Sequence, residues 1–412
     1  MLLPFPENRV PAISAAATRT LIAVTAAVSV VQLTITRNAT LPIAGLSHVL
    51  GFTPAHFNPL CLISYTFIHA DASHLLLNMC YLLVFGAGVE AAVGKPRFLG
   101  LYFSGGVLGA LLQALVALRM PILLSPASAI LGSSAACSTL IGVYAVRYYR
   151  DRIRFVGLPY RPTVVELVTV FLTIEIGAGI WQIFSGQSQD GIAHWAHVGG
   201  FVFGLCCAYL LKLDDRGTTA YWQQDAATAL DNSLPGAAIQ RLEQLIERNP
   251  DCGEERIHLA EAWLAYGDMD QAADACLDAI RIHTGAGRRK EAARAYRAIR
   301  ELAAKSDSTD SAARWNSPLM PDLTPAELFT VGLSLEEEGN LADSAEALRA
   351  VSIRVPGSAE AETALVRVIA MYGGLLKRAE EARILAQLFL ESYPNSPLRP
   401  RVQEMLKQLS GA

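Results

Sequence analysis

The sequence predicts an all-α protein built from a six-helix transmembrane bundle followed by a cytoplasmic α-solenoid of helical hairpins. Two observations support this fold class. Residues 1–216 are long apolar runs with few charges, 13 lysines and arginines against 9 aspartates and glutamates. Residues 217–412 are rich in Ala, Glu, Arg and Leu at helical spacing, with 21 basic against 29 acidic residues. A chain of 412 residues is long enough for two domains, so we place a boundary between residues 216 and 217.

Six apolar segments in the first part have about the length that a helix needs to cross a bilayer, roughly 20 residues. They are residues 20–35, 74–93, 98–118, 129–146, 164–184 and 192–211. A single buried helix of a soluble protein can also be apolar, but six in succession are hard to bury without lipid. The first part is therefore predicted to be a multi-pass membrane domain.

The basic residues between these segments predict the orientation of the domain. One side of the membrane would carry Arg9, Arg19, Lys95, Arg97, Arg147, Arg150, Arg152, Arg154, Arg161, Lys212 and Arg216. The other side would carry only Arg37 and Arg119. Because cytoplasmic loops are enriched in Lys and Arg, both termini are expected in the cytoplasm of a cell (inner) membrane protein. The first ten residues lack the pattern of a signal peptide, and none is expected.

Ser134 and His197 are candidates for chemistry because they are polar and predicted to lie at the same depth. Ser134 is 13 residues before Arg147 at the end of segment four, and His197 is 15 residues before Lys212 after segment six. At 1.5 Å per residue, both would lie about 20 Å above the cytoplasmic ends of their helices. Hydrogen bonds to their own or a neighbouring helix would also explain each residue. As a pair at one height, they suggest a nucleophile with its base.

Small residues accompany both candidates. His197, Gly200 and Gly204 share one helical face, where small residues allow another helix to approach closely. Gly132 permits an unusual backbone just before the two serines. Free amides at a helix start can stabilise an oxyanion. Ser133 lies about 100° round the axis from Ser134, so both hydroxyls cannot face one histidine. Ser133 is instead expected to cap the start of that helix by accepting from a free backbone amide.

His74 and Asn78 add two polar side chains to segment two. They are four residues apart and share a helical face. Hydrogen bonds between helices would explain them, but side-chain amides and imidazoles also suit an oxyanion site. Both interpretations remain open from the sequence.

These motifs together resemble the rhomboid family of intramembrane serine proteases. The matching stretches are "FIHADASHLLLNM" with His74 and Asn78, Gly132-Ser133-Ser134 as the family's G-x-S, and Ala196-His197 with Gly200 and Gly204. The stretch "VFGAGVEAAVGKPRFLGLY", with Glu90, is also similar. The resemblance covers residues 57–211.

The resemblance implies a Ser134–His197 dyad without an acid, with His74, Asn78 and the Ser134 amide as the oxyanion site. Gly132, Gly200 and Gly204 would then be structural. It implies cleavage of transmembrane protein substrates by water admitted from the outer face, with no cofactor and no metal. Two positions depart from the family pattern: Ala135 replaces a glycine, and Ser138 stands where an aromatic residue is common. An inactive rhomboid-like protein that binds membrane clients and recruits partners is therefore the alternative.

Other polar residues receive structural interpretations. His194 is expected to be solvated at the outer interface, and His69 to shape an outer loop. Glu175, in the middle of segment five, is expected to be hydrogen-bonded and packed inward, with gating or substrate contact as the alternative. The seven cysteines show no metal-ligand spacing and are expected to be buried small hydrophobes. No basic stripe interleaves with aromatics, so nucleic acid is not an expected partner.

The second part repeats one design. Three stretches each contain a helix, a glycine turn and a second helix, with turns at Gly267-Asp268, Gly339-Asn340 and Gly373-Gly374. The last two turns are 34 residues apart, the tetratricopeptide period. We predict four or five degenerate tetratricopeptide-like hairpins over residues 217–304 and 326–412, joined by a linker over 305–325. Such arrays bind proteins or peptides, so a cytoplasmic partner is expected, with a solubilising or dimerising role as the alternative.

The sequence thus favours an intramembrane serine endopeptidase with a cytoplasmic helical-repeat domain. Its expected partners are the lipid bilayer, transmembrane protein substrates, and a cytoplasmic protein or peptide bound by the repeats. A transporter is disfavoured because the two halves of the membrane domain show no inverted repeat and no matched broken helices.

Overall fold

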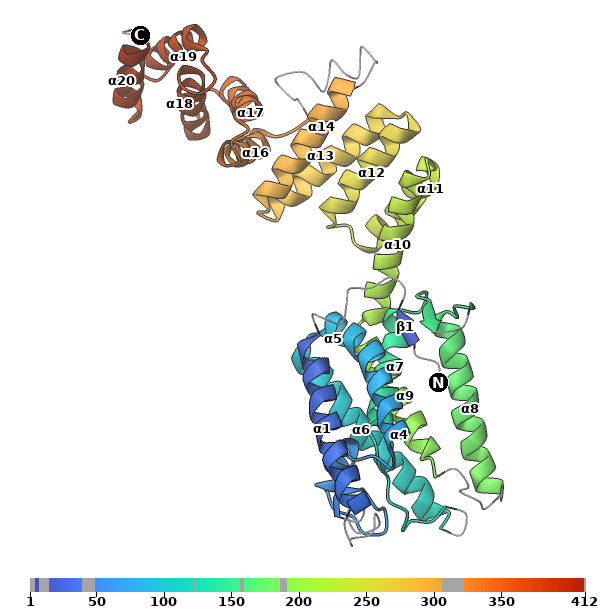
Figure 1. The fold of residues 1–412 in the computed structure, drawn as a ribbon. Helices are drawn as coiled ribbons and strands as arrows, with labels where there is room; N and C mark the ends of the chain where they lie inside the picture. The colour runs from blue at the N-terminus through green and yellow to red at the C-terminus, as the bar shows by residue number, and fades with distance from the viewer. Residues whose placement is uncertain are drawn as a thin grey trace. The chain divides into compact units, whose positions relative to one another are not determined.

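The structure is a computed structural model, and it describes residues 4–6, 15–38, 49–121, 124–155, 159–185, 191–305 and 322–410. Helices dominate these residues (Figure 1). The short strand β1 (Pro4–Pro6) pairs antiparallel with β2 (Ile153–Phe155). The chain divides into two compact units, Met1–Thr218 and Thr219–Ala412. The division falls within helix α10 (Leu213–Asp231).

The first unit is a bundle of apolar helices. Its long helices are α1 (Ala16–Asn38), α6 (Lys95–Arg119), α7 (Ser134–Arg147), α8 (Val164–Ser185) and α9 (His194–Leu210). Between α1 and α6 lie α3 (Cys61–Ser64), the 3-10 turn η2 (Tyr65–Phe67), α4 (Ala72–Tyr81), the π-helical turn η3 (Leu82–Gly86) and α5 (Ala87–Val93). The last three form one continuous apolar stretch from residue 72 to residue 93.

Four of the described helical stretches are long and apolar enough to cross a membrane: α1, residues 72–93, α6 and α8. The pair α9 and α10 makes a fifth if their 69° bend is counted as part of one span. Helix α7 has only 14 residues because it starts at Ser134, five residues later than the apolar run that begins at residue 129. A multi-pass membrane protein is therefore supported, while the number six stays a prediction.

Helices α6, α7 and α9 all pack against one another, and α7 is buried along most of its length. A Cβ atom at Gly200 would lie 2.2 Å from the Ala135 carbonyl oxygen, and one at Gly204 would lie 2.1 Å from that of Thr139. The later glycine of α9 meets the later carbonyl of α7, so the two helices run parallel. The two helices can pack this closely only because residues 200 and 204 are glycines, which have no Cβ atom.

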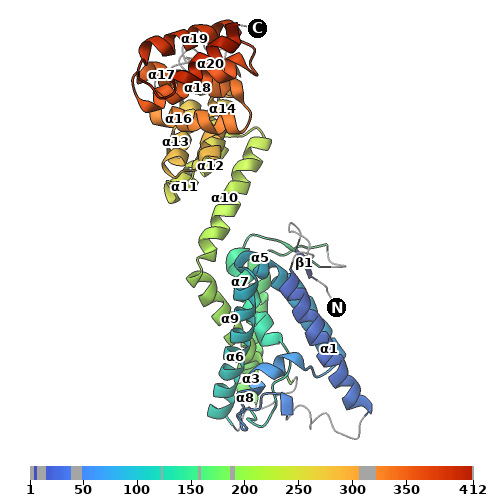
Figure 2. The same ribbon diagram turned by 90° about the vertical axis from the view of Figure 1, so that its left-hand side faces the viewer.

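A buried carboxylate joins α1 to the end of the second apolar stretch. Glu90 accepts hydrogen bonds from the backbone amides of Ala17 and Thr18, at 3.0 and 2.7 Å, and from the Thr18 hydroxyl at 2.8 Å. These amides lie in the first turn of α1 and have no acceptor within the helix. Glu90 therefore caps α1, whose N-terminal end lies beside α5 (Figure 2).

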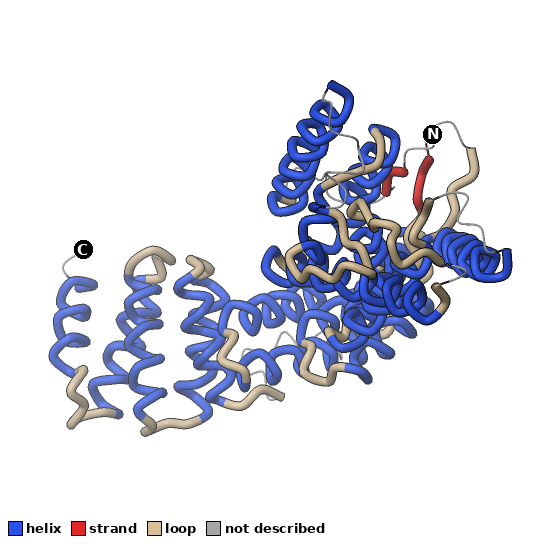
Figure 3. The backbone as a smooth tube through the Cα atoms, turned by 90° about the horizontal axis from the view of Figure 1, so that it is seen from below, coloured by secondary structure: helices blue, strands red, loops and turns tan. Residues whose placement is uncertain are grey.

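The second unit is a row of helices in which each described helix packs against the next (Figure 3). They are α11 (Pro235–Arg248), α12 (Gly253–Tyr266), α13 (Met269–Gly285), α14 (Arg289–Lys305), α16 (Pro325–Glu337), α17 (Leu341–Arg354), α18 (Ala359–Gly373), α19 (Ala379–Ser392) and α20 (Arg399–Ser410). Gly267 and Gly339 turn the chain with φ of +100° and +81°, which glycine adopts without strain. The predicted linker over 305–325 falls largely outside the described residues, apart from its ends.

Candidate active site

Ser134 and His197 meet at the ends of two neighbouring helices. The Ser134 hydroxyl oxygen lies 2.7 Å from Nε2 of His197, within hydrogen-bond distance, and both residues are part-buried. Ser134 is the first residue of α7 and His197 is the fourth of α9. The parallel, close packing of these helices places the two side chains at one height.

Ser133 does not act as the helix cap that its position suggested. It occupies the N-cap position of α7 and is fully buried, but its side chain accepts no hydrogen bond from the first turn. Its hydroxyl lies 4.0 Å from the Cys137 sulfur, at the limit of a hydrogen bond. The expectation of a capping serine is therefore wrong, and the hydroxyl on His197 belongs to Ser134.

Glu175 of α8 completes a chain of hydrogen bonds behind His197. One carboxylate oxygen of Glu175 lies 2.9 Å from Nδ1 of His197 and 2.7 Å from Nδ1 of His194. His197 thus faces the serine with one ring nitrogen and a carboxylate with the other. A dyad without an acid, as the resemblance implied, does not describe this site.

His194 differs from its sequence interpretation. It was expected to be solvated, yet its exposed fraction is 3% and it bonds Glu175. Two features of the sequence are signals of polar contacts here: Glu175 stands in the apolar middle of α8, and His194 precedes His197 by three residues on the same helical face, although neither specifies that α8 meets α9. The hydrogen bonds of Glu175 agree with its expected inward packing.

The side chains of His74 and Asn78, both on α4, lie against Gly132 in the turn that precedes α7. Gly132 has φ of +97°, and a Cβ there would come within 2.6 Å of the His74 ring and 3.3 Å of Nδ2 of Asn78. The Gly132 amide donates to the carbonyl of Tyr65 at 3.0 Å, which fixes this turn. Glycine is therefore required here both for its backbone angle and for the approach of the two polar side chains.

Asn78 keeps a free donor in this corner. The residue is 4% exposed, and its amide nitrogen has no hydrogen-bond partner among the described residues. A buried donor without a partner is costly and is rare in folded proteins. Together with the amides at the start of α7, it supplies hydrogen-bond donors close to the serine.

The two departures from the family pattern are accommodated locally. The methyl group of Ala135 lies against Gly109 of α6, where a Cβ would come within 2.9 Å of it. Gly109 therefore leaves the space that the Ala135 methyl occupies. The hydroxyl of Ser138 donates to the Ser134 carbonyl at 2.9 Å, within α7.

His69 packs against His74 and contacts α1. It is fully buried, Nδ1 lies 2.8 Å from the Ser29 hydroxyl, and its amide donates to the Gln32 side chain at 3.1 Å. Its ring meets that of His74 edge to face, with centroids 5.1 Å apart. His69 therefore orients His74 and ties it to α1.

Four of the cysteines are buried as expected, at positions 61, 137, 252 and 276. Cys206 on α9 is exposed, and positions 80 and 207 are half-buried, so the expectation of burial is wrong for Cys206. All seven are free thiols. Within the part of the chain that the structure describes, metal-type donors converge at Glu175, His194 and His197, whose ligand atoms all lie within 4.8 Å of one another.

Comparison with known proteins shows which family the membrane unit is similar to. Residues 56–213 match the rhomboid domain family model, a range that includes all the site residues described above. The chain is 29% identical over 148 residues to Rhomboid-related protein 1 of Caenorhabditis elegans, covering 36% of this chain and 38% of that protein. It is 29% identical over 152 residues to RHOMBOID-like protein 4 of Arabidopsis thaliana, covering 37% and 34%. It is 26% identical over 219 residues to Rhomboid-like protease 1 of Toxoplasma gondii, covering 50% and 68%.

This match and the relatives support a rhomboid family protein that is embedded in a membrane. The chain spans little more than a third of the length of the first two relatives. The family model match ends at residue 213 and does not reach the second unit.

Proposed function

We propose that the protein is an intramembrane serine endopeptidase that cleaves transmembrane protein substrates. The observation that carries this proposal is the 2.7 Å contact between the Ser134 hydroxyl and Nε2 of His197. A serine hydroxyl is a weak nucleophile on its own and needs an adjacent base within this distance. The surrounding helices are apolar, so the peptide bond that reaches the site would belong to a membrane-embedded segment.

The proposed reaction proceeds through an acyl-enzyme. The Ser134 oxygen attacks the scissile carbonyl carbon while His197 Nε2 takes the hydroxyl proton, and the carbonyl electrons move onto oxygen. The Asn78 amide, His74 and the Ser134 backbone amide would stabilise that oxyanion. The intermediate collapses, the C–N bond breaks, and His197 returns the proton to the leaving amine. Water then hydrolyses the ester, again with His197 as base.

Glu175 has a positioning role in this proposal. With the carboxylate on Nδ1, the neutral imidazole carries its proton at Nδ1 and presents a lone pair at Nε2. That tautomer is the one able to accept the serine proton. The carboxylate also stabilises the imidazolium formed during attack.

The proposed placement is a cell (inner) membrane with both termini in the cytoplasm. A reporter enzyme fused after residue 412 should then score cytoplasmic, and one inserted within residues 185–190 should score external. The opposite pattern would reverse the orientation and place Ser134 near the cytoplasmic side.

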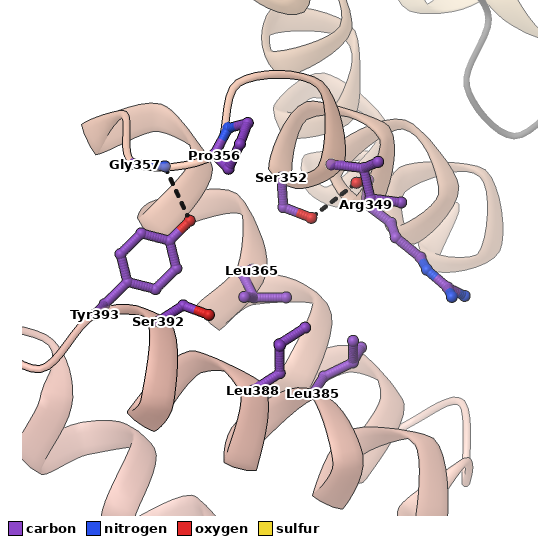
Figure 4. Close-up of a pocket in the computed structure, with 10 residues that line it drawn as sticks. Arg349, Ser352, Pro356, Gly357, Leu365, Leu385, Leu388, Ser392 and Tyr393 are labelled. Atoms are coloured by element: carbon purple, nitrogen blue, oxygen red, sulfur yellow. Dashed lines mark hydrogen bonds between the residues drawn. The ribbon is translucent and has the colours of Figure 1, made fainter.

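We also propose that the second unit is a tetratricopeptide-like array that binds a cytoplasmic protein or peptide. A hollow of about 470 Å³ lies between α17, α18 and α19 (Figure 4). Leu365, Leu385 and Leu388 form an apolar side of this hollow, while Arg349 and Tyr393 lie at its edges. Such a surface suits a peptide with apolar side chains. If residues 220–412 serve only for binding, deleting them should leave cleavage of a generic transmembrane substrate intact.

An activity-based probe tests the proposed nucleophile. A fluorophosphonate should label the detergent-purified protein and its Ser133→Ala variant, but neither Ser134→Ala nor His197→Ala. Ser133 is the matched control because it is adjacent and does not contact the histidine. Labelling that survives Ser134→Ala would refute the assignment. A folded wild-type protein that neither takes up the probe nor cleaves a transmembrane substrate would favour the inactive rhomboid-like alternative.

A further inference from the structure

The side chains of Glu175, His194 and His197 form a compact donor cluster inside the helical bundle. One carboxylate oxygen and two imidazole Nδ1 atoms all lie within 4.8 Å of one another. Within the described ranges, the ion pairs of Glu175 are those with the two histidines. If both histidines are neutral, the cluster carries one negative charge in an apolar environment, which is costly without a compensating cation.

The donors match the preferences of one metal in particular. Two imidazole nitrogens and one carboxylate oxygen form the donor set of many zinc sites that keep a fourth position for water. Tetrahedral zinc with bonds of about 2.0–2.2 Å separates its ligand atoms by about 3.3 Å. The present separations from the carboxylate oxygen are 2.7 and 2.9 Å, so the side chains would need to move apart by about half an ångström.

We propose that this cluster is a reversible zinc site whose occupation switches off the serine–histidine pair, an inference that rests on the proposed function. Zinc would bind Nδ1 of both histidines, with the single proton of each neutral ring shifted from Nδ1 to Nε2, and would also bind the Glu175 carboxylate. The two histidines come from one turn of α9 and the glutamate from α8, so the ion would also bridge these two helices.

The inhibition follows from the chemistry of imidazole. When Nδ1 of a neutral imidazole binds a metal ion, the remaining proton resides on Nε2. Nε2 of His197 would then donate toward Ser134 instead of accepting its proton. The serine would lose its base even though the two side chains remain in contact. Removal of zinc would restore the tautomer that Glu175 maintains.

Zinc reaches the cluster through a partly open surface. The side chains of Glu175 and His197 each retain an exposed fraction of 12%, against 4% for His194. The ion would therefore approach over Glu175 and His197, and His194 would complete the site from the interior.

The test measures zinc binding and probe labelling separately on the full-length protein in detergent. Equilibrium dialysis should show one tightly bound Zn²⁺ per chain, lost in His194→Ala and in Glu175→Gln. The matched control is His258→Ala, which removes a histidine that pairs with Glu261 at 3.2 Å on the exposed face of α12. That variant should bind zinc as the wild type does, and Mg²⁺ should not compete.

Fluorophosphonate labelling is then compared with and without zinc, so that each variant serves as its own reference. Zinc should slow labelling of the wild type and of His258→Ala at least tenfold, and a chelator should reverse this. For His194→Ala, the ratio of the labelling rate without zinc to the rate with zinc should be close to one, whatever the absolute rate of labelling is. If the wild type binds no more zinc than His194→Ala and Glu175→Gln do, the proposed site is refuted. This result does not depend on whether the fluorophosphonate labels the protein. Binding that leaves the wild-type labelling rate unchanged would refute the switch.

Discussion

The substitution Gly200→Ala should separate the serine from its base without touching either residue. A Cβ at this position would lie 2.2 Å from the Ala135 carbonyl oxygen, and that oxygen belongs to the first turn of α7. Carbon–oxygen contacts between helices are normally about 3.3 Å or longer. Helices α7 and α9 would therefore have to move apart locally by about 1 Å.

The consequence for the site follows from its present geometry. His197 is three residues before Gly200 on α9, so the same displacement would lengthen the 2.7 Å contact with Ser134 beyond hydrogen-bond reach. Misplacement of a reacting group by about 1 Å costs on the order of 100-fold in rate. Overpacking typically lowers the free energy of unfolding by about 1–3 kcal/mol, which a folded variant can survive.

The assay is the rate of fluorophosphonate labelling, measured together with the thermal unfolding midpoint in the same detergent. Gly177→Ala is the matched control, because a Cβ at Gly177 of α8 would meet no atom within 4 Å. We expect about 100-fold slower labelling for Gly200→Ala and wild-type labelling for Gly177→Ala. If folded Gly200→Ala labelled at the wild-type rate, the helix separation would not control the site, and the reasoning would be refuted.

Three further outcomes are expected. Asn78→Ala should slow substrate cleavage by about 100- to 1,000-fold with little change in thermal stability, because its unpartnered amide would contact only the oxyanion; unchanged turnover would remove Asn78 from the site. Gly132→Ala should abolish labelling and destabilise the first unit, since the methyl group would clash with the His74 ring and the φ of +97° disfavours any side chain; a near-normal midpoint in thermal unfolding would contradict this. In the second unit, burial lowers the pKa of His283, and the charge of Arg288 lowers it further. The unfolded chain then binds this proton more readily, so stability should fall as the pH drops below about 6.5, and denaturant unfolding should show a flatter pH profile in His283→Gln.

The sequence was most informative where one residue type stands out against its surroundings. Ser134 and His197 are polar residues at matched distances from the charged ends of their segments, and the structure brings them together. The glycines at 132, 200 and 204 were recognisable because a close approach requires them. These features depend on position along a helix, which the sequence specifies directly.

The remaining features depend on which helices become neighbours and on the rotation of each helix about its axis. The contact between Glu175 and the two histidines joins α8 to α9, and nothing in the spacing within either segment specifies that pairing. The prediction for His194 failed because its position suggested an interface, while its rotation on α9 turns it inward. The position of Ser133 in the chain predicts that it caps α7. Its burial depends on tertiary packing, which the hydrophobic periodicity of the sequence does not reveal.

The carboxylate of Glu90 has a consequence for how the membrane unit can be divided. The family model match begins at residue 56, so α1 lies entirely before it. Yet, among the described residues, Glu90 accepts its hydrogen bonds from the first turn of α1, and His69 contacts Ser29 of the same helix. A protein trimmed to the matched region would leave the buried Glu90 carboxylate without these donors and the His69 ring without its contact to Ser29. We therefore expect the smallest stable membrane unit to include α1 as well as the residues that match the family model.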